Sequence, residues 1–328
     1  NDWSDWVYFN ASGTRFSPNV NQDYNIKGVA FSDTLGSGVQ YTIVGTGTLG
    51  MTNGIVNQMS SAQSISAPIR LDANASIWNY GTDPVEHRGA LTVGGTINLN
   101  TKTVFLTPSN NNITLSGSIS GVGNLYARGP GNVIISAAND FTGEIRIING
   151  TVETSFGANL GSLSNVIRFR GESISDTPTF RRTTTGGISL LVDLGEFGGT
   201  IANPTGTTVT YSGSVVSDLN ATTAGLYKNE TGTAVLQRPL AYAGPTVVRA
   251  GSLRVESTLP RTPVTVIAAS TLELIGNTHL VPSATVAGTL NLVSGAELTL
   301  GLASSGTGGA IDVTGTITGL TGKLTKRG

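Results

Sequence analysis

The sequence predicts an all-β fold, a right-handed parallel β-helix (β-solenoid). Three observations predict it: a composition poor in helix-forming residues, many short runs of alternating polarity, and a block of residues that occurs twice. At roughly 22 residues per coil, within the usual range for such repeats, the 328 residues correspond to about 15 coils.

The composition excludes several classes of protein. Gly contributes 44 residues and charged residues only 12% of the chain, and Gly, Ser, Thr and Asn are poor residues for a helix interior. With 38% hydrophobic residues and a net charge of −1, the chain has too much core material to be disordered. No apolar run approaches the roughly 18 residues of a membrane span, and no basic tract is present. We therefore expect no membrane insertion of this segment and no nucleic-acid partner.

Strand-like runs occur along the whole chain, separated by Gly, Asn or Ser. Most of them alternate apolar and polar residues, which is typical of a strand with one buried face. No pattern indicates a helix longer than about two turns. The predicted strands lie within residues 39–45, 89–99, 111–121, 132–136, 144–148, 208–216, 246–255, 262–268, 270–276, 284–292 and 296–302.

A block that starts at Leu125 occurs again at Leu226, 101 positions later and without a gap. Phe141 then matches Tyr242, and apolar residues match apolar residues between the two copies. Such matching indicates a repeated backbone path, with glycines where the coil turns. The corner glycines of the two copies are Gly143, Gly150, Gly244 and Gly251.

An antiparallel sandwich also contains many short strands, but it has no internal sequence period. Stacked coils explain the near-copies better. We predict a continuous solenoid over residues 26–328, with loop excursions near 79–89 and 168–187, where charged residues gather. Residues 1–25 are rich in aromatic side chains and are predicted to be a cap or junction segment, the alternative being a sugar-binding platform.

These residues resemble the autotransporter-type β-strand repeat of bacterial surface and secreted proteins. The first copy, NLYARGPGNVIISAANDFTGEIRIINGTVE (124–153), follows that repeat closely, with Phe141 in the aromatic slot before Thr-Gly. The second copy follows it more loosely, with Ala243 in place of the threonine. The resemblance implies an exported bacterial protein, extracellular or at the cell surface, with a role in adhesion, biofilm matrix or a surface fibre.

Residues 319–328 look like the opening of a third copy, with Leu324 in the position of Leu125. One interpretation is a fragment of a longer protein. The other is head-to-tail self-stacking, in which the first segment of one subunit pairs with the last coil of the next. The candidate assembly junction consists of Trp3, Trp6, Tyr8, Phe9, Leu320 and Leu324.

The residues that could support catalysis are few. The histidines are His87, in the charged 79–89 segment, and His279, interpreted as a surface or coil-corner residue. Asp176 with Arg181 and Arg182 is the nearest approach to a charged cluster, whereas glycoside hydrolysis needs two neighbouring carboxyl groups. Zinc-ligand spacing and phosphate-binding motifs are absent. We predict a protein that is not an enzyme and uses no cofactor or metal.

The predicted function is that of an extracellular structural or adhesive β-solenoid, rod-like, whose partners are further copies of itself and a host-surface or polysaccharide ligand. The alternative is a carbohydrate-active β-helix enzyme of the polysaccharide lyase or glycosidase type. Convergence of the charged excursions over one groove would favour the enzyme.

Overall fold

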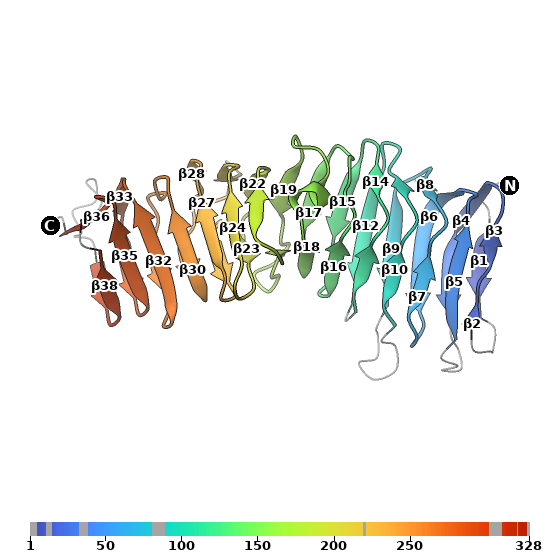
Figure 1. Cartoon of the computed structure of the whole chain (residues 1–328), viewed down its shortest axis with the longest axis horizontal. Coiled ribbons are helices and arrows are strands. Elements are labelled where there is room, and N and C mark those ends of the chain that lie inside the picture. The colour runs from blue at the N-terminus through green and yellow to red at the C-terminus, as the bar shows by residue number, and fades with distance from the viewer. Residues whose placement is uncertain are drawn as a thin grey trace. The chain divides into compact units, whose positions relative to one another are not determined.

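The computed structural model describes residues 5–10, 15–32, 39–80, 89–109, 111–218, 221–301, 310–319 and 321–326. The chain forms two compact units, Asn1–Asn165 and Val166–Gly328. Each unit is a stack of parallel β-coils (Figure 1). The predicted β-solenoid is confirmed, but the chain makes about 13 turns and not 15.

The first unit contains eighteen described strands and a single-turn 3-10 helix, η1. They are β1 (Trp6–Phe9), β2 (Arg15–Phe16), β3 (Asn19–Val20), β4 (Tyr24–Ser32), β5 (Gln40–Gly45), β6 (Leu49–Gln58), β7 (Gln63–Ile65), β8 (Ile69–Leu71), β9 (Ala75–Asn79), β10 (Leu91–Val93), β11 (Ile97–Asn98), β12 (Thr103–Pro108), β13 (Ile113–Leu115), β14 (Ile119–Ser120), β15 (Asn124–Ala127), β16 (Asn132–Ile135), β17 (Glu144–Ile147), β18 (Thr151–Thr154) and η1 (Gly157–Leu160).

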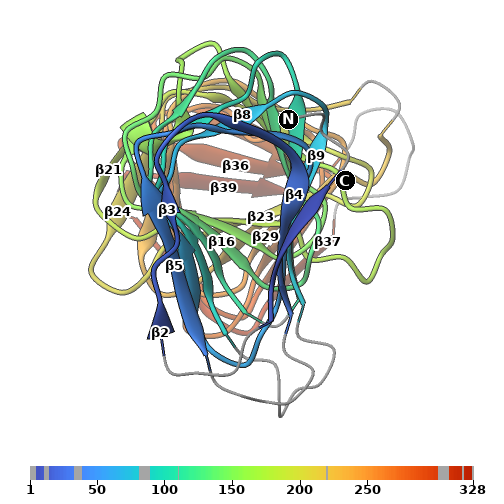
Figure 2. The same ribbon diagram turned by 90° about the vertical axis from the view of Figure 1, so that its right-hand side faces the viewer.

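Parallel pairing sorts these strands into the faces of a coil. One face consists of β5, β7, β10, β13, β16 and β18, a second of β8, β11 and β14, and a third of β9, β12, β15 and β17. The long strand β6 serves two faces, because its start pairs with β8 and its end with β9. Figure 2 shows β4 and β5 on two walls of one coil.

The core of the first unit is built from ladders of identical or similar apolar side chains. Ile43, Ile65, Val93, Leu115 and Ile135 pair one above another, and each is at most 2% exposed. Neighbouring strands in a sheet lie about 4.8 Å apart, so such side chains contact each other directly. Burying each of them contributes about 1.5–3 kcal/mol, which is why inward positions alternate with polar outward ones.

Buried amides stabilise the corners of the first unit. Asn57 pairs with Asn79 in the next coil, and its Nδ2 donates to Asn79 Oδ1 over 2.9 Å. Asn79 Nδ2 in turn donates to the carbonyl of Asn112, also over 2.9 Å. Because buried polar groups must be hydrogen-bonded, this ladder satisfies groups that a turning backbone would otherwise leave without partners.

The second unit contains the remaining strands, again all parallel in their pairing. They are β19 (Val166–Phe169), β20 (Thr179–Arg182), β21 (Gly186–Ile188), β22 (Leu191–Leu194), β23 (Gly199–Ala202), β24 (Thr208–Tyr211), β25 (Val215–Ser217), β26 (Leu226–Asn229), β27 (Thr233–Leu236), β28 (Leu240–Ala241), β29 (Thr246–Val248), β30 (Gly251–Val255), β31 (Val264–Val266), β32 (Ser270–Ile275), β33 (Thr278–Val281), β34 (Ser283–Val286), β35 (Thr289–Val293), β36 (Glu297–Leu300), β37 (Ala310–Val313), β38 (Thr316–Thr318) and β39 (Lys323–Lys326).

The faces of the second unit follow the same logic. One face is β20, β23, β26, β29, β31, β34 and β37, and another is β21, β24, β27, β30, β32, β35 and β38. The third consists of β19, β22, β25 and β28, with the separate group β33, β36 and β39. An internal ladder of Tyr211, Leu236, Val255, Leu274 and Leu292 runs through this unit, with each residue at most 3% exposed.

The two sequence copies have the same internal register. In the first copy Leu125 pairs with Ile145, and in the second Leu226 pairs with Thr246. The repeated backbone path is therefore confirmed within each unit. In each copy the two paired strands belong to successive coils.

Each of the four corner glycines stands where a side chain would not fit. Gly150 and Gly251 have φ of 70° and 65°, in the left-handed region that favours glycine. A Cβ at Gly143 would lie 1.9 Å from the carbonyl oxygen of Gly123, and one at Gly244 would lie 2.3 Å from that of Thr223. At all four corners the coil below approaches too closely for a side chain.

The structure describes one of the two predicted excursions in full, and the other excursion and the predicted cap or junction segment in part. Residues 168–187 are not one loop, because they include the end of β19, all of β20 and the start of β21. Residues 170–178 form the connection between β19 and β20. Within residues 1–25, β1 pairs with β4 while β2 and β3 pair with β5. Residues 81–88 of the 79–89 segment lie outside the described residues. Among the described residues, no helix has the length and hydrophobicity that crossing a bilayer would require.

Candidate functional site

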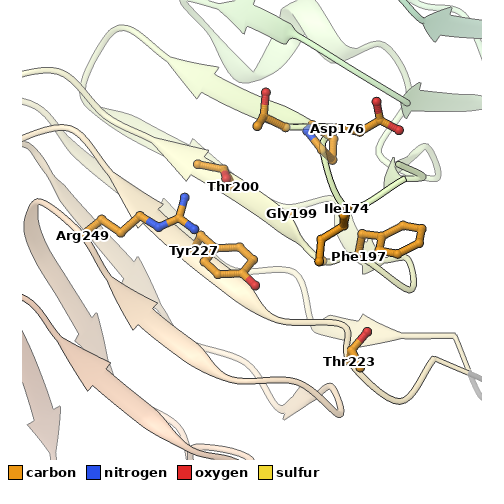
Figure 3. Close-up of a pocket in the computed structure, with 11 residues that line it drawn as sticks. Ile174, Asp176, Phe197, Gly199, Thr200, Thr223, Tyr227 and Arg249 are labelled. Carbon is orange, nitrogen blue, oxygen red and sulfur yellow. The ribbon is translucent and has the colours of Figure 1, made fainter. Parts of the chain in front are cut away.

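A cleft of about 290 Å³ lies in the second unit, where residues 170–178 pass beside β23, β26 and β29 (Figure 3). Ile174 and Phe197 lie together on one side of it, and Tyr227 and Arg249 lie on the other. Its lining residues are Ile174, Asp176, Thr177, Pro178, Phe197, Gly198, Gly199, Thr200, Thr223, Tyr227 and Arg249.

Tyr227 and Arg249 form the polar side of the cleft. Strand alternation turns Tyr227 outward between the buried Leu226 and Lys228. Arg249 follows β29, and its guanidinium carbon lies 4.3 Å from the centroid of the tyrosine ring. This is a cation–π contact. Arg249 forms no ion pair with any described residue, so its N–H groups are available to a ligand.

The opposite side of the cleft is apolar and exposed. Ile174 is 91% exposed and Phe197 is 37% exposed. Phe197 stands at a tight turn that closes with a hydrogen bond from Gly198 N to Gly195 O, over 2.9 Å. These two side chains give the cleft an apolar surface opposite its polar side.

Asp176 is the single carboxylate among the lining residues. Its Oδ2 accepts hydrogen bonds from the backbone N–H groups of Glu172 and Ser173, over 2.6 and 2.7 Å. The carboxylate therefore holds residues 172–176 in a turn, as aspartate commonly does in loops.

Asp176, Arg181 and Arg182 are the nearest approach to a charged cluster in the sequence, and each has its own partners in the structure. Arg181 pairs with Glu230 over 2.8 Å. Arg182 is 3% exposed and donates to the carbonyls of Thr184 and Gly187, over 3.2 and 3.0 Å. Burial lowers the pKa of the Arg182 guanidinium. Asp176, Arg181 and Arg182 thus have three separate structural roles and do not converge over the groove.

His279 is not the surface residue that the sequence suggested. It lies on β33, is fully buried, and its Nδ1 accepts a hydrogen bond from Leu259 N over 3.2 Å. Burial lowers the pKa of the imidazole to about 4, so the ring is neutral at physiological pH. His87 lies outside the described residues.

The first unit carries a related surface on β12, β15 and β17. Phe105 pairs with Tyr126, and their ring centroids are 5.5 Å apart. The Arg128 guanidinium lies 4.2 Å from the Phe105 ring centroid, and that of Arg146 lies 4.3 Å from the centroid of Tyr126. Glu144 accepts from both the Tyr126 hydroxyl and, over 2.7 Å, the Arg146 guanidinium.

Tyr126 and Tyr227 occupy equivalent positions of the two copies, 101 positions apart. Each is half-buried and faces outward, and each carries an arginine on its ring. Sequence reasoning missed these residues. The available signal was an aromatic residue kept at an outward position of both copies, where packing in the core does not require one.

The predicted junction residues that the structure describes lie in the first strand of the first unit and in the last strand of the second unit. Trp6 and Phe9 pair with Gly28 and Phe31, and Tyr8 is 64% exposed. An apolar cleft of about 220 Å³ beside β1 is lined by Phe9 among others. Leu324 pairs with Leu298 and is 39% exposed. Trp3 and Leu320 lie outside the described residues.

Comparison with known proteins gives one informative similarity. No family model matches the chain, and no solved structure matches it. The chain is similar to the adhesin BmaC autotransporter of Brucella suis biovar 1 (strain 1330), with 29% identity over 292 residues. The match covers 82% of this chain but 8% of that protein. The similarity agrees with the autotransporter-type resemblance of the two copies.

No group of three or more His, Cys, Asp or Glu side chains that could hold a metal ion occurs among the described residues.

Proposed function

We propose that this chain is part of an extracellular adhesive protein, in which the β-solenoid is the scaffold and outward side chains contact the partner. The observation that carries the proposal is the similarity to an adhesin autotransporter over 82% of the chain. The parallel β-solenoid fold supports it, since stacked coils present a long outer surface without changing the core.

The same surface explains how adhesion would operate. Outward positions on each coil are free of packing constraints, so single rings and cations such as Tyr227 and Arg249 can be placed there. The cleft joins them to an exposed apolar wall. Several weak contacts of this kind, made at once, give strong attachment through effective concentration.

The cleft favours binding over hydrolysis. Glycosidases use two carboxyl groups on opposite sides of the scissile bond. Asp176 alone supplies a carboxylate here, and two backbone N–H groups already occupy one of its oxygens. We therefore propose a non-enzymatic role.

The test is retention of the purified 328-residue protein on epithelial cells and on a polysaccharide array, together with an assay for new reducing ends. Saturable binding without release of reducing ends is the expected result. Steady release of reducing ends would instead establish the carbohydrate-active enzyme, and absence of binding to every surface would overturn adhesion.

Head-to-tail stacking is a second candidate, supported by the apolar cleft beside β1 and by the exposure of Leu324. Negative-stain electron microscopy at micromolar concentration and after dilution tests it. Filaments that shorten on dilution are expected, whereas isolated particles at every concentration would contradict it.

A further inference from the structure

Three arginines of the described residues hold the guanidinium carbon over an aromatic ring: Arg128 over Phe105, Arg146 over Tyr126 and Arg249 over Tyr227. Arg146 is also paired with Glu144 over 2.7 Å. Neither Arg128 nor Arg249 forms an ion pair with a described residue. Both are exposed, one in each unit.

Most of the other arginines with described side chains are neutralised. Arg70 pairs with Asp72, Arg181 with Glu230, and Arg254 with Glu256 and Glu273. Arg168 and Arg170 share the nearly buried Asp193. Against this background, a ring-held arginine without an acid is a distinct arrangement, and it occurs in both units.

The ring contact fixes the guanidinium before any ligand arrives. A free arginine loses side-chain entropy when it binds, and holding it in place beforehand reduces this cost. The guanidinium can stack on a ring while its N–H groups still point sideways, in the geometry that matches a carboxylate or sulfate. Arg128 and Arg249 are therefore prepared to receive an anionic group.

Only a ligand with repeated anionic groups would gain much from such sites. A single exposed ion pair is worth about 0–1 kcal/mol, so a small free anion would bind weakly. A polymer holds many anionic groups close together, so an anionic group that leaves a guanidinium is soon replaced there by its neighbour on the same chain. Near Arg249 the cleft also offers the hydroxyl group of Tyr227, and the apolar side chains of Ile174 and Phe197 lie on its opposite side. Hydroxyl groups combined with apolar ring faces suit a sugar chain.

We propose that Arg128 and Arg249 are binding subsites for a linear acidic polysaccharide, whose carboxylate or sulfate groups dock on the ring-held guanidinium groups. The inference rests on the proposed adhesive function and names its ligand class. The chain's low net charge leaves general attraction to polyanions weak, so binding depends on these two positions.

The experiment measures binding of fluorescein-labelled oligogalacturonate, heparin oligosaccharide and neutral dextran to the full chain by fluorescence anisotropy, at 20 and 150 mM salt. The test variant is the double substitution Arg128→Gln and Arg249→Gln. Its matched control is Arg238→Gln with Arg261→Gln, since both are exposed arginines that lie on no described ring. Circular dichroism and thermal unfolding verify that each variant is folded.

We expect an acidic probe to bind and dextran not to bind. The test variant should lose about 10-fold or more in affinity, as expected for charge-assisted hydrogen bonds, and the control should stay within about twofold. Replacing the rings, with Phe105→Leu and Tyr227→Leu, keeps the charge and should cost about two- to fivefold. Preference for oligogalacturonate identifies carboxylates as the docking groups, and preference for heparin identifies sulfates.

Equal losses in the test and control variants would overturn the proposal, because binding would then be general charge attraction. Equal binding of dextran, or no binding of either acidic probe, would also overturn it. In each of these cases, unchanged attachment of the full chain to cells would leave the adhesive function standing, and lost attachment would contradict both.

Discussion

The two units differ in the chemistry of their buried polar side chains. In the first unit, among described residues, these are uncharged: Asn57, Gln63, Asn79, Thr154, Asn159 and Asn165. The second unit buries ionisable groups as well, including Arg182, Asp193, Lys228 and His279. The same coil architecture therefore tolerates two kinds of interior, and the buried ionisable groups of the second make its stability depend on pH.

The two sequence copies show how the second kind arises. Ala127 of the first copy corresponds to Lys228 of the second, which is fully buried. The Lys228 ammonium donates to the carbonyls of Asn229, Glu230 and Ala250, over 2.7, 2.7 and 3.3 Å. A methyl group is thus replaced by a cation whose three N–H groups find backbone acceptors at the corner of the coil.

A second exchange involves two positions at once. Phe141 and Ile145 of the first copy become Tyr242 and Thr246 in the second, and the two new hydroxyl groups hydrogen-bond over 2.6 Å. Both second-copy residues are nearly or fully buried. The two copies therefore share one backbone path, while buried side chains can become polar where the new polar groups hydrogen-bond to each other.

The largest effect is expected where the copies are the same. Gly150→Ala and Gly251→Ala should each lower the free energy of unfolding by more than about 3 kcal/mol, because the new Cβ would lie 2.2 Å from Gly129 O and 2.4 Å from Gly232 O. The control is Gly295→Ala, with φ of 77° and no atom within 4 Å, which should cost only about 1 kcal/mol. Urea unfolding measures all three, and equal costs for control and corners would refute the shared backbone constraint.

The next largest effect is a dependence of stability on pH that arises from Lys228 in the second unit. Burial lowers the pKa of its ammonium from 10.5 to about 8. The unfolded chain therefore binds more protons than the folded chain between these pH values, so stability should rise as pH increases through this window, by up to about 3 kcal/mol. In Lys228→Met this rise should disappear. Thermal unfolding of both proteins between pH 7 and 10 tests it, and parallel curves would show that Lys228 does not titrate as proposed.

His279 should make the stability of the second unit depend on pH under acidic conditions. Its pKa is about 4 in the folded chain against 6.5 ordinarily, so the unfolded chain again binds more protons between these values. Stability should fall by up to about 3 kcal/mol as pH decreases from 6.5 to 4. His279→Gln should flatten this fall. Hydrogen exchange by mass spectrometry should place the change near β33, and a change confined to the first unit would contradict the assignment.

The smallest effect concerns the hydroxyl pair. Tyr242→Phe should cost about 1–2 kcal/mol by leaving the buried Thr246 hydroxyl without its partner. The double variant Tyr242→Phe with Thr246→Ile installs the pair found in the first copy and should recover most of that loss. A double-mutant cycle by urea unfolding measures the coupling, and additive losses would mean that the two positions vary independently.

The fold was predictable because its rules are local and repeated. Glycines such as Gly150 and Gly251 stand where the backbone needs them, and alternating runs mark the faces. The number of coils was not, because coil length varies: the paired residues Ile65 and Val93 are 28 positions apart, whereas Leu236 and Val255 are 19 apart. The assumed 22 residues are fewer than the average coil contains, so the number of coils was overestimated.

The site was harder to predict. His279 follows a turn at Gly276 and Asn277, which hides that it is in phase with the buried Val281 on β33. The cleft depends on where residues 170–178 fold back over strands distant in sequence, which no local pattern encodes. The outward Tyr126 and Tyr227 could have been found, because a surface ring kept in both copies has no role in the core.

The identical register of the two copies has a consequence for how such chains change during evolution. Each coil forms the same parallel strand pairing with the coil before it and with the coil after it. A duplicated coil can therefore be inserted, and both of its neighbours keep suitable strands to pair with. The coil is thus the smallest segment that can be duplicated while its neighbours keep their pairing. Its outward positions are then free to diverge. The arginine over the tyrosine ring is Arg146 in the first copy and Arg249 in the second, which is two residues beyond the position that corresponds to Arg146. Relatives of this chain should accordingly differ in length by whole coils, and in surface chemistry between them.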